Sequence, residues 1–218
     1  MSAPTAVRIV TDRHVRLDGD LALPAGARTI VVFAHGSGSS RRSPRNREVA
    51  ATLGGAGIAT LLLDLLTADE GRLDDRTAQL RFDIALLARR LVGAVDWVAA
   101  EPATKDLAIG LFGASTGAAA ALVAAAERPS LGRAGVSRGG RPDRAGVAML
   151  AKVRAPTLLI VGGDDDVVVT LNRDALASLA ARPKEFVVVP GATHLFEEPG
   201  TLEEVARLAS EWFRRHLA

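Results

Sequence analysis

Residues 111–127 read LFGASTGAAAALVAAAE, and they join an apolar run to an alanine-rich helical pattern through one serine. Within them, residues 113–117 (GASTG) fit the pattern Gly-x-Ser-x-Gly, in which a strand reverses sharply into a helix. Such a reversal strains the backbone of the serine and needs small residues where strand and helix nearly touch. It also places Ser115 at a helix N-terminus, whose free N–H groups stabilise negative charge. The stretch therefore predicts a strand, a helix and a nucleophile at Ser115 between them.

Outward from this turn, compact apolar runs alternate with helical patterns along the whole chain. This alternation predicts a mostly parallel sheet with helices on both faces, and we expect one domain over residues 1–218 because no repeat or long linker divides them. Chemistry in such sheets lies at the carboxyl ends of the strands. The predicted strands are 6–10, 14–23, 29–35, 58–66, 106–114, 133–137, 155–163 and 184–190, and the predicted helices are 47–57, 74–102, 116–127, 171–182 and 201–218.

The composition excludes several classes of protein. The 218 residues include no cysteine, so disulfides, thiolate metal sites and a cysteine nucleophile are excluded. The isoelectric point is basic, about 9.6, but the formal net charge is only +2, and we do not expect a nucleic-acid partner. No apolar run has the length of a membrane span, and the first residues lack the order of a secretory signal. We expect a soluble, cytoplasmic protein with no membrane partner.

A serine hydroxyl needs a base, and the chain has four histidines. His14 and His216 lie in the predicted terminal hairpin and terminal helix, where surface positions are expected. His35 follows the first buried strand, and we expect it to hold its loop by hydrogen bonds. His194 lies between the last strand and the last helix, where a loop can return to the serine, so His194 is the predicted base.

The histidine in turn needs an acid that fixes its tautomer. Asp164, Asp165 and Asp166 follow the strand at 155–163, and the order serine, aspartate, histidine along the chain is one known for such relays. Successive side chains point in different directions, so only one of the three is expected to face His194. The residues themselves leave the choice open.

The loop after the first buried strand, AHGSGSSRRSPRNRE at 34–48, is the predicted source of oxyanion donors. A tetrahedral intermediate needs two N–H donors, and we expect the amides of Thr116 and Ser37. Glycines at 36 and 38 allow close approach to a ligand, but no third glycine or Gly-Lys-Ser/Thr follows, so a phosphate cradle is weakly supported.

Arginines are frequent near the predicted site. Arg42 and Arg45, with neighbours at 41 and 47, could bind a carboxylate or phosphate of the substrate, and so could Arg141. The alternative is a solvated arginine-rich surface. Arg138, which precedes Arg141 in the segment SRGGRPDRAG, could also bind an anionic substrate, and exposure at the surface is the expectation for it.

Taken together, HGSGSSRRSPRN (35–46), GASTG, APTLLIVGGDDDVV (155–168) and GATHLFEEPG (191–200) resemble the α/β-hydrolase superfamily, and within it the small dienelactone-hydrolase-like group. The first segment, with VSRGGRPD (136–143), is similar to a bacterial subset sometimes fused to a phosphoribosyltransferase domain. The resemblance implies an acid in the context Gly-x-x-Asp-x-Val, and Gly163, Asp166 and Val168 match it, which selects Asp166. Only about 18 residues separate the strands at 133–137 and 155–163, so no large cap or lid is expected.

The sequence thus predicts a serine hydrolase that cleaves small carboxylic esters or related acyl substrates. Ser115 attacks, His194 moves the proton, Asp166 orients the histidine, and the Ser37 and Thr116 amides bind the oxyanion. This chemistry needs no metal and no organic cofactor, and the same site could support perhydrolysis. The alternative is a binding or scaffold module for an anionic metabolite or a phosphoribosyltransferase-type partner. The oligomeric state is left open.

Overall fold

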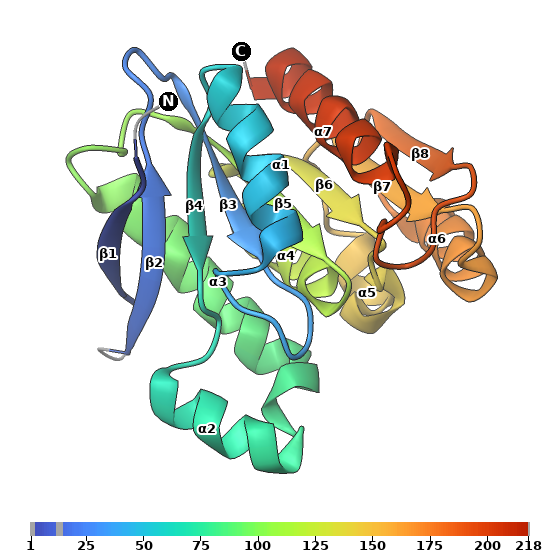
Figure 1. Ribbon diagram of the computed structural model, residues 1–218, viewed down its shortest axis with the longest axis horizontal. Coiled ribbons are helices and arrows are strands. Elements are labelled where there is room, and N and C mark those ends of the chain that lie inside the picture. The colour runs from blue at the N-terminus through green and yellow to red at the C-terminus, as the bar shows by residue number, and fades with distance from the viewer. Residues whose placement is uncertain (1–2, 12–14, 218) are drawn as a thin grey trace.

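A computed structural model describes residues 3–11 and 15–217, which form one eight-stranded sheet in the order β1-β2-β4-β3-β5-β6-β7-β8 (Figure 1). The first two strands form an antiparallel hairpin, β2 pairs antiparallel with β4, and every other neighbouring pair is parallel. The mostly parallel sheet is as predicted. The strands are β1 (Thr5–Val10), β2 (Arg16–Ala22), β3 (Thr29–Ala34), β4 (Ala59–Leu63), β5 (Ala108–Ala114), β6 (Gly132–Arg138), β7 (Thr157–Gly162) and β8 (Lys184–Val189).

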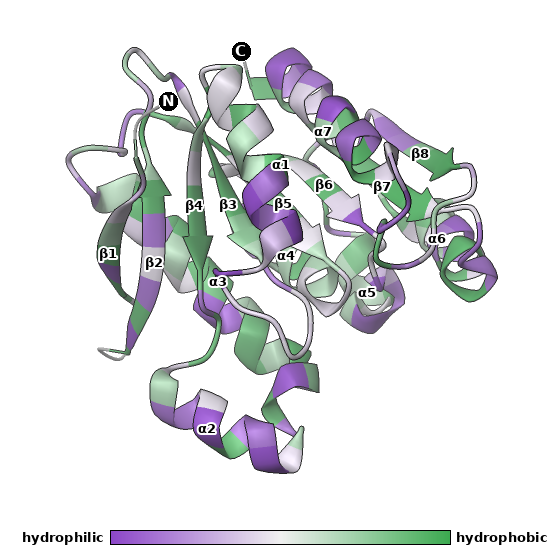
Figure 2. Cartoon of the chain, viewed as in Figure 1, coloured by the Kyte–Doolittle hydropathy of each residue, from purple (hydrophilic) through white to green (hydrophobic). Residues whose placement is uncertain are grey.

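Helices cover both faces of the sheet and bury its apolar side chains in two layers (Figure 1). Helices α1 (Pro44–Gly55) and α7 (Thr201–Leu217) pack on one face. Helices α3 (Ile84–Ala100), α4 (Thr116–Glu127) and α6 (Asp166–Ser178) pack on the other. Figure 2 shows the resulting pattern, with hydrophobic strands inside and hydrophilic residues on the outer surface of α7. The apolar runs of the sequence form strands because both of their faces are covered.

The predicted helix at 74–102 is wrong, because the structure divides this segment into three. Helix α2 (Ala68–Thr77) ends at Ala78, which has a left-handed φ of 52°, and a short turn η2 (Leu80–Phe82) precedes α3. The buried carboxylate of Asp74 accepts hydrogen bonds from the amides of Leu80 and Arg81, at 2.8 and 2.9 Å. These bonds stabilise the reversal, and the Asp83 side chain then caps α3.

Thr201 and Glu204 have the sequence spacing of a capping box at the start of the last helix, but the structure forms none there. The Thr201 hydroxyl donates to the carbonyl of Glu198 at 2.7 Å, and Glu204 pairs with Arg207 instead of reaching back. A complete capping box occurs at α2, where Thr67 and Glu70 satisfy each other's backbone amides. The spacing of Thr67 and Glu70 is visible in the sequence, but the helix that they cap begins before residue 74, where the apolar pattern predicted a helix start.

Short elements occupy the connection between β6 and β7, as the expectation of no large cap requires. They are the turn η3 (Pro142–Ala145) and the four-residue helix α5 (Val147–Leu150). Helix α2, which follows β4, instead projects beyond the carboxyl ends of the strands, at the bottom of Figure 1. Additional structure at the carboxyl edge of the sheet therefore comes from the segment between β4 and α3.

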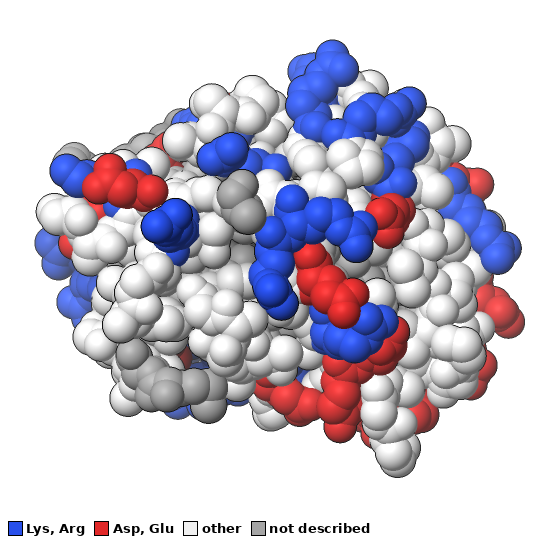
Figure 3. Space-filling view, turned by 90° about the horizontal axis from the view of Figure 1, so that it is seen from above, with Lys and Arg blue, Asp and Glu red and all other residues white. Residues whose placement is uncertain are grey.

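Figure 3 views the molecule from above Figure 1, at the end opposite α2, and shows side chains of both charges there. Arg215 of α7 and Glu185 of β8 form one ion pair, at 3.5 Å. Among the described residues, no helix has both the length and the apolar character that crossing a membrane requires.

Candidate active site

Ser115 lies in a strained turn between the end of β5 and the start of α4. Its backbone has φ 50° and ψ −119°, a conformation that residues with a side chain rarely adopt. Three backbone hydrogen bonds hold the turn: the Ser115 amide donates to the carbonyl of Arg138, and its carbonyl accepts from the amides of Ala118 and Arg141, each at 3.1 Å. The predicted reversal is present, and it holds the serine hydroxyl at the carboxyl edge of the sheet.

The glycines on either side of the serine allow backbones to touch. A Cβ atom on Gly113 would lie 2.4 Å from the Cα of Ala118, and one on Gly117 would lie 2.3 Å from the carbonyl oxygen of Ala34. Both distances are far below van der Waals contact. Strand β5, helix α4 and the end of β3 can therefore meet at this turn only because both positions lack a side chain.

We expect Gly117→Ala to lower the free energy of unfolding by about 1–3 kcal/mol, because the new methyl group must push the chain at Ala34 and His35 aside. The matched control is Gly54→Ala in α1, where an added Cβ has no heavy atom within 4 Å. There the greater helix propensity of alanine should raise stability by about 0.5–1 kcal/mol. Urea unfolding of the two variants measures the difference, and a Gly117→Ala protein as stable as the wild type would contradict this account.

His194 lies beside the serine. Its Nε2 atom is 3.3 Å from the Oγ atom of Ser115, across 79 positions of sequence. The side chain is 37% exposed, so it is partly open to solvent. The loop that carries it is tied by Glu198, whose carboxylate accepts bonds from the Thr193 amide at 3.0 Å and the Thr193 hydroxyl at 2.6 Å. The predicted approach of His194 to Ser115 is thus present.

Asp165, rather than Asp166, faces the histidine. The Oδ2 atom of Asp165 is 2.6 Å from Nδ1 of His194. Asp166 is the first residue of α6, and its side chain is exposed, as is that of Asp164. An ionised carboxylate only accepts hydrogen bonds, so Nδ1 carries the hydrogen and Nε2 presents its lone pair to the serine. The choice of Asp166 is therefore corrected to Asp165.

The sequence repeats glycine, aspartate and valine at adjacent positions between 162 and 169, and this repetition explains why Asp166 was selected. The context Gly-x-x-Asp-x-Val fits Gly163, Asp166 and Val168, but it fits Gly162, Asp165 and Val167 equally well. The structure requires glycine at 162, where a Cβ atom would lie 2.3 Å from the carbonyl oxygen of Ala192. At Gly163 the nearest atom would be 3.1 Å away. The tighter contact favours the alignment of Gly162, Asp165 and Val167.

The predicted oxyanion donors lie next to the serine. Gly36 approaches so closely that a Cβ atom on it would be 3.2 Å from the Cβ of Ser115, and Ser37 follows it. The Thr116 amide is at the first position of α4. Within the described part of the chain, neither the Ser37 amide nor the Thr116 amide has an acceptor in the protein. Both donors are therefore available for an added oxygen atom.

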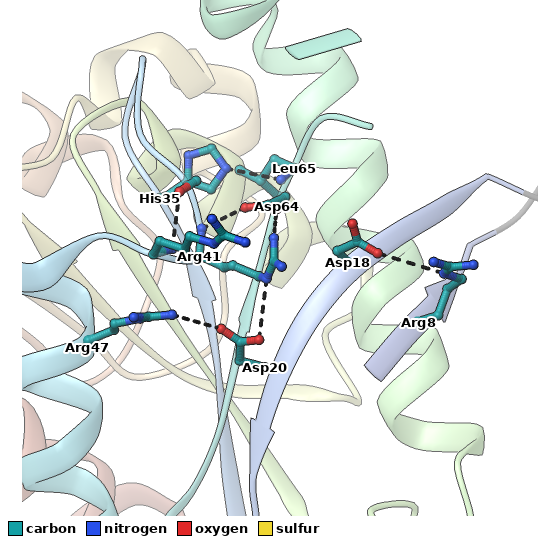
Figure 4. A network of polar contacts seen from close by, with 10 residues as sticks. Arg8, Asp18, Asp20, His35, Arg41, Arg47, Asp64 and Leu65 are labelled. Carbon is teal, nitrogen blue, oxygen red and sulfur yellow. Dashed lines mark hydrogen bonds and ion pairs between the residues drawn. The ribbon is translucent and has the colours of Figure 1, made fainter. Parts of the chain in front are cut away.

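His35 fixes the loop that carries Ser37. Its Nδ1 atom lies 2.9 Å from the carbonyl oxygen of Gly36, and its Nε2 accepts from the amide of Leu65 at 3.1 Å (Figure 4). Both ring nitrogens are thereby used in the neutral form. Arg41 ties the same loop to the end of β4, because its amide donates to Asp64 at 2.7 Å and its guanidinium pairs with Asp64 and Asp20 (Figure 4).

We expect stability to fall with pH below about 6.5 in part because of His35. Burial lowers the pKa of His35 from its ordinary value of 6.5, so the unfolded chain binds the proton more readily than the folded one. Each such histidine can remove up to about 1.4 kcal/mol of stability per pH unit as the pH falls. Urea unfolding at pH 7.5, 6 and 5 measures the slope.

The control is His35→Gln, which should flatten this slope whatever its effect on stability at pH 7.5. Part of the slope should remain, because burial also lowers the pKa of His216, with a smaller contribution from the charge of Arg215. An unchanged slope in the His35→Gln protein would show that His35 does not titrate in this way.

A cleft of about 610 Å³ lies between the loop at 35–44 and the segment of α2 and η2. It reaches Gly36 and Ser37, and so it borders the candidate oxyanion donors. Its far wall includes Asp74 and Arg81, which form an ion pair at 2.7 Å. Most of the lining residues have polar or charged side chains, although polar and apolar atoms share the lining surface about equally, and such a cleft suits a small molecule with polar groups.

The arginines proposed to bind substrate differ in their partners. Arg42 is exposed and lines the cleft. Arg45 pairs with Glu197 at 3.0 Å, and Arg141 makes two bonds of 2.8 Å to Asp143, which raise the pKa of Arg141. Arg45 and Arg141 thus already have carboxylate partners within the protein. Arg138, expected at the surface, is buried, and His14 lies outside the described residues.

Among residues 3–11 and 15–217, no group of three or more His, Cys, Asp or Glu side chains is placed to hold a metal ion. A strained serine turn at the carboxyl edge of a mostly parallel sheet, with histidine and aspartate on later loops, defines the fold and site of an α/β-hydrolase. The chain belongs to the dienelactone hydrolase family, whose model matches residues 17–217. It is a hydrolase.

Similar proteins agree with this assignment. The crystal structure of dienelactone hydrolase from Anabaena variabilis is 58% identical in sequence and superposes with a TM-score of 0.96, covering 99% of this chain and 98% of that one. Est1E from Butyrivibrio proteoclasticus, 17% identical, has the same fold, with a TM-score of 0.79 and coverage of 96% and 98%.

A curated relative has a different kind of name. A Mycobacterium tuberculosis protein named "Putative phosphoribosyl transferase" is 59% identical over 203 residues, which are 93% of this chain and 44% of the relative. The chain therefore spans less than half the length of this relative.

Proposed function

We propose that the protein is a serine hydrolase that cleaves small carboxylic esters through an acyl-enzyme. The observation that carries this proposal is one continuous relay, with 3.3 Å between Ser115 Oγ and His194 Nε2 and 2.6 Å between His194 Nδ1 and Asp165 Oδ2. Three residues from separate loops have no structural need to align in this way. The alignment is what a serine nucleophile requires.

In acylation, Ser115 Oγ attacks the ester carbonyl carbon while its proton passes to His194 Nε2. The carbonyl oxygen becomes an oxyanion, which accepts hydrogen bonds from the Ser37 and Thr116 amides. The carbon–oxygen bond to the alcohol then breaks, and His194 returns the proton to that oxygen. Asp165 stabilises the imidazolium throughout without taking its proton.

In deacylation, water replaces the alcohol. His194 takes a proton from the water, the resulting hydroxide attacks the acyl carbon, and the carboxylic acid leaves as the proton returns to Ser115 Oγ. The polar lining of the cleft beside Ser37 supports a small, polar ester as substrate. No cofactor enters either step.

Labelling with a fluorophosphonate tests the proposal directly. The Ser115 Oγ–phosphorus bond should form with loss of fluoride, giving one adduct per chain on the peptide that contains Ser115. Mass spectrometry identifies that peptide, and hydrolysis of p-nitrophenyl acetate should stop in parallel with labelling. A folded wild-type protein that stays unlabelled and inactive would refute a serine mechanism.

A second candidate is a binding role toward a phosphoribosyltransferase-type partner. The observation that favours it is the length of the Mycobacterium tuberculosis relative, of which this chain matches only 44%. Turnover of p-nitrophenyl acetate that survives His194→Ala would favour this candidate, because the turnover would then not use the relay.

A further inference from the structure

Arg138 is buried at the end of β6 without a carboxylate partner. Only 6% of the residue is exposed, and its Nε atom has no hydrogen-bond partner among the residues that the structure describes. The one hydrogen bond of its side chain among these residues joins Nη2 to Oδ1 of Asn46, at a long 3.5 Å. A buried guanidinium normally pairs with an acid, so this side chain needs another explanation.

The surroundings make the charge still less favourable. Asn46 belongs to the first turn of α1, where the helix dipole is positive. Burial, together with the nearby positive charge of Arg45, lowers the pKa of Arg138 to about 10. Stability alone would thus favour an apolar side chain at this position.

The guanidinium lies over the ring of Phe196. Its central carbon is 5.8 Å from the ring centre, which is within the range of a cation–π contact. Phe196 comes two residues after His194, is 2% exposed, and has a left-handed φ of 56°. That backbone conformation is strained for an aromatic residue, so the packing of the ring must hold it in place.

The backbone of the same segment contacts both partners of the relay. The Arg138 carbonyl accepts the hydrogen bond of the Ser115 amide at 3.1 Å. At Gly139, a Cβ atom would lie 3.1 Å from the carbonyl oxygen of His194 and 3.4 Å from the Phe196 ring. Arg138 therefore holds the serine turn with its backbone and the histidine loop with its side chain.

We propose that Arg138 is a positioning residue for the hydrolytic site, which sets the approach of His194 to Ser115 by holding the Phe196 ring. The proposal rests on the proposed function, because it concerns the same relay. On this proposal the buried charge of Arg138 serves catalysis. The guanidinium holds the strained loop of Phe196 in position, and the Arg138 carbonyl is hydrogen-bonded to the serine turn.

The main test is Arg138→Met, which keeps the volume and removes the charge. We expect kcat for p-nitrophenyl acetate to fall about 10- to 100-fold with an unchanged KM, because a small displacement of the histidine affects the chemical step. The midpoint of urea unfolding should stay the same or rise, because an unpaired buried charge has been removed. A kcat within twofold of the wild type would overturn the proposal.

Two esters separate positioning from substrate binding. Neutral p-nitrophenyl acetate and anionic mono-p-nitrophenyl succinate should lose kcat equally in Arg138→Met. A loss confined to the anionic ester, seen as a higher KM, would overturn the proposal and make Arg138 a contact of the substrate. Arg128→Met is the matched control, since Arg128 pairs with Asp96 at the far end of α4 and its loss should leave kcat unchanged.

Arg138→Lys provides a second test of the proposal if Arg138→Met does not fold. It retains the charge but lacks the flat group that covers the ring, so we expect a loss of about 3- to 10-fold in kcat. A wild-type rate in this variant would overturn the proposal. Fluorophosphonate labelling of the wild type separates the two failures: no labelling refutes the serine mechanism, whereas equal labelling of wild type and Arg138→Met refutes only the role of Arg138.

Discussion

Replacing Ser115 by alanine is expected to lower kcat/KM for p-nitrophenyl acetate by about 10⁴- to 10⁶-fold, to the level left by the oxyanion donors alone. The alanine removes the oxygen atom that is proposed to form the acyl bond, yet it leaves the strained turn and its three backbone hydrogen bonds in place. Fluorophosphonate labelling should disappear in the same protein. Initial rates and intact-protein mass spectra measure both effects.

Ser37→Ala is the matched control, because the proposed role of Ser37 uses its amide and not its hydroxyl. We expect it to keep most of the wild-type activity. His194→Ala should lose about as much as Ser115→Ala, and the double variant should lose no more than either, because the two residues act as one unit. A Ser115→Ala protein that retains a tenth of the activity would place the nucleophile elsewhere.

The second large effect is expected at Asp165. Asp165→Asn should lower kcat by about 10³- to 10⁴-fold, because an amide cannot stabilise the imidazolium and can donate to Nδ1, which favours the wrong tautomer. The shape of the side chain is unchanged, so the 2.6 Å contact to His194 has a partner of the same size. Steady-state kinetics on p-nitrophenyl acetate provide the measurement.

Asp166→Asn is the comparison that makes this result specific. Its side chain is exposed at the start of α6, and kcat should stay within about twofold of the wild type, as for surface substitutions away from a site. The opposite result, a large loss in Asp166→Asn with Asp165→Asn active, would mean that the loop rearranges in solution and that the resemblance had selected the correct acid.

The sequence was sufficient for the parts of the fold that local patterns determine. Helix α4 has the predicted bounds, and the parallel strands lie where apolar runs predicted them, because strands covered on both faces need continuous apolar residues. The proximity of Ser115 and His194 could be predicted, because Ser115 lies in a distinctive turn and His194 lies between the last strand and the last helix, where a loop can return to the serine.

The remaining differences depend on contacts between distant residues. The choice between Asp165 and Asp166 depends on how closely β7 approaches Ala192, which repeated letters in the sequence do not show. The break between α2 and α3 depends on a single buried carboxylate at Asp74. Arg138 was expected at the surface because arginine usually is, and only the packing of Phe196 against it shows otherwise.

The far wall of the cleft and the proposed reacting groups come from different segments of the chain. The proposed nucleophile, base and acid follow β5, β8 and β7, whereas the far wall of the cleft comes from the stretch between Leu63 and Ile84. The ion pair between Arg81 and Asp74 lies within that stretch, and the pair between Arg90 of α3 and Glu70 fastens the stretch to α3. Replacing the stretch between Leu63 and Ile84 by another sequence would change the shape of the cleft and leave the proposed reacting groups in place. Substrate range and reaction type can therefore evolve independently in this fold.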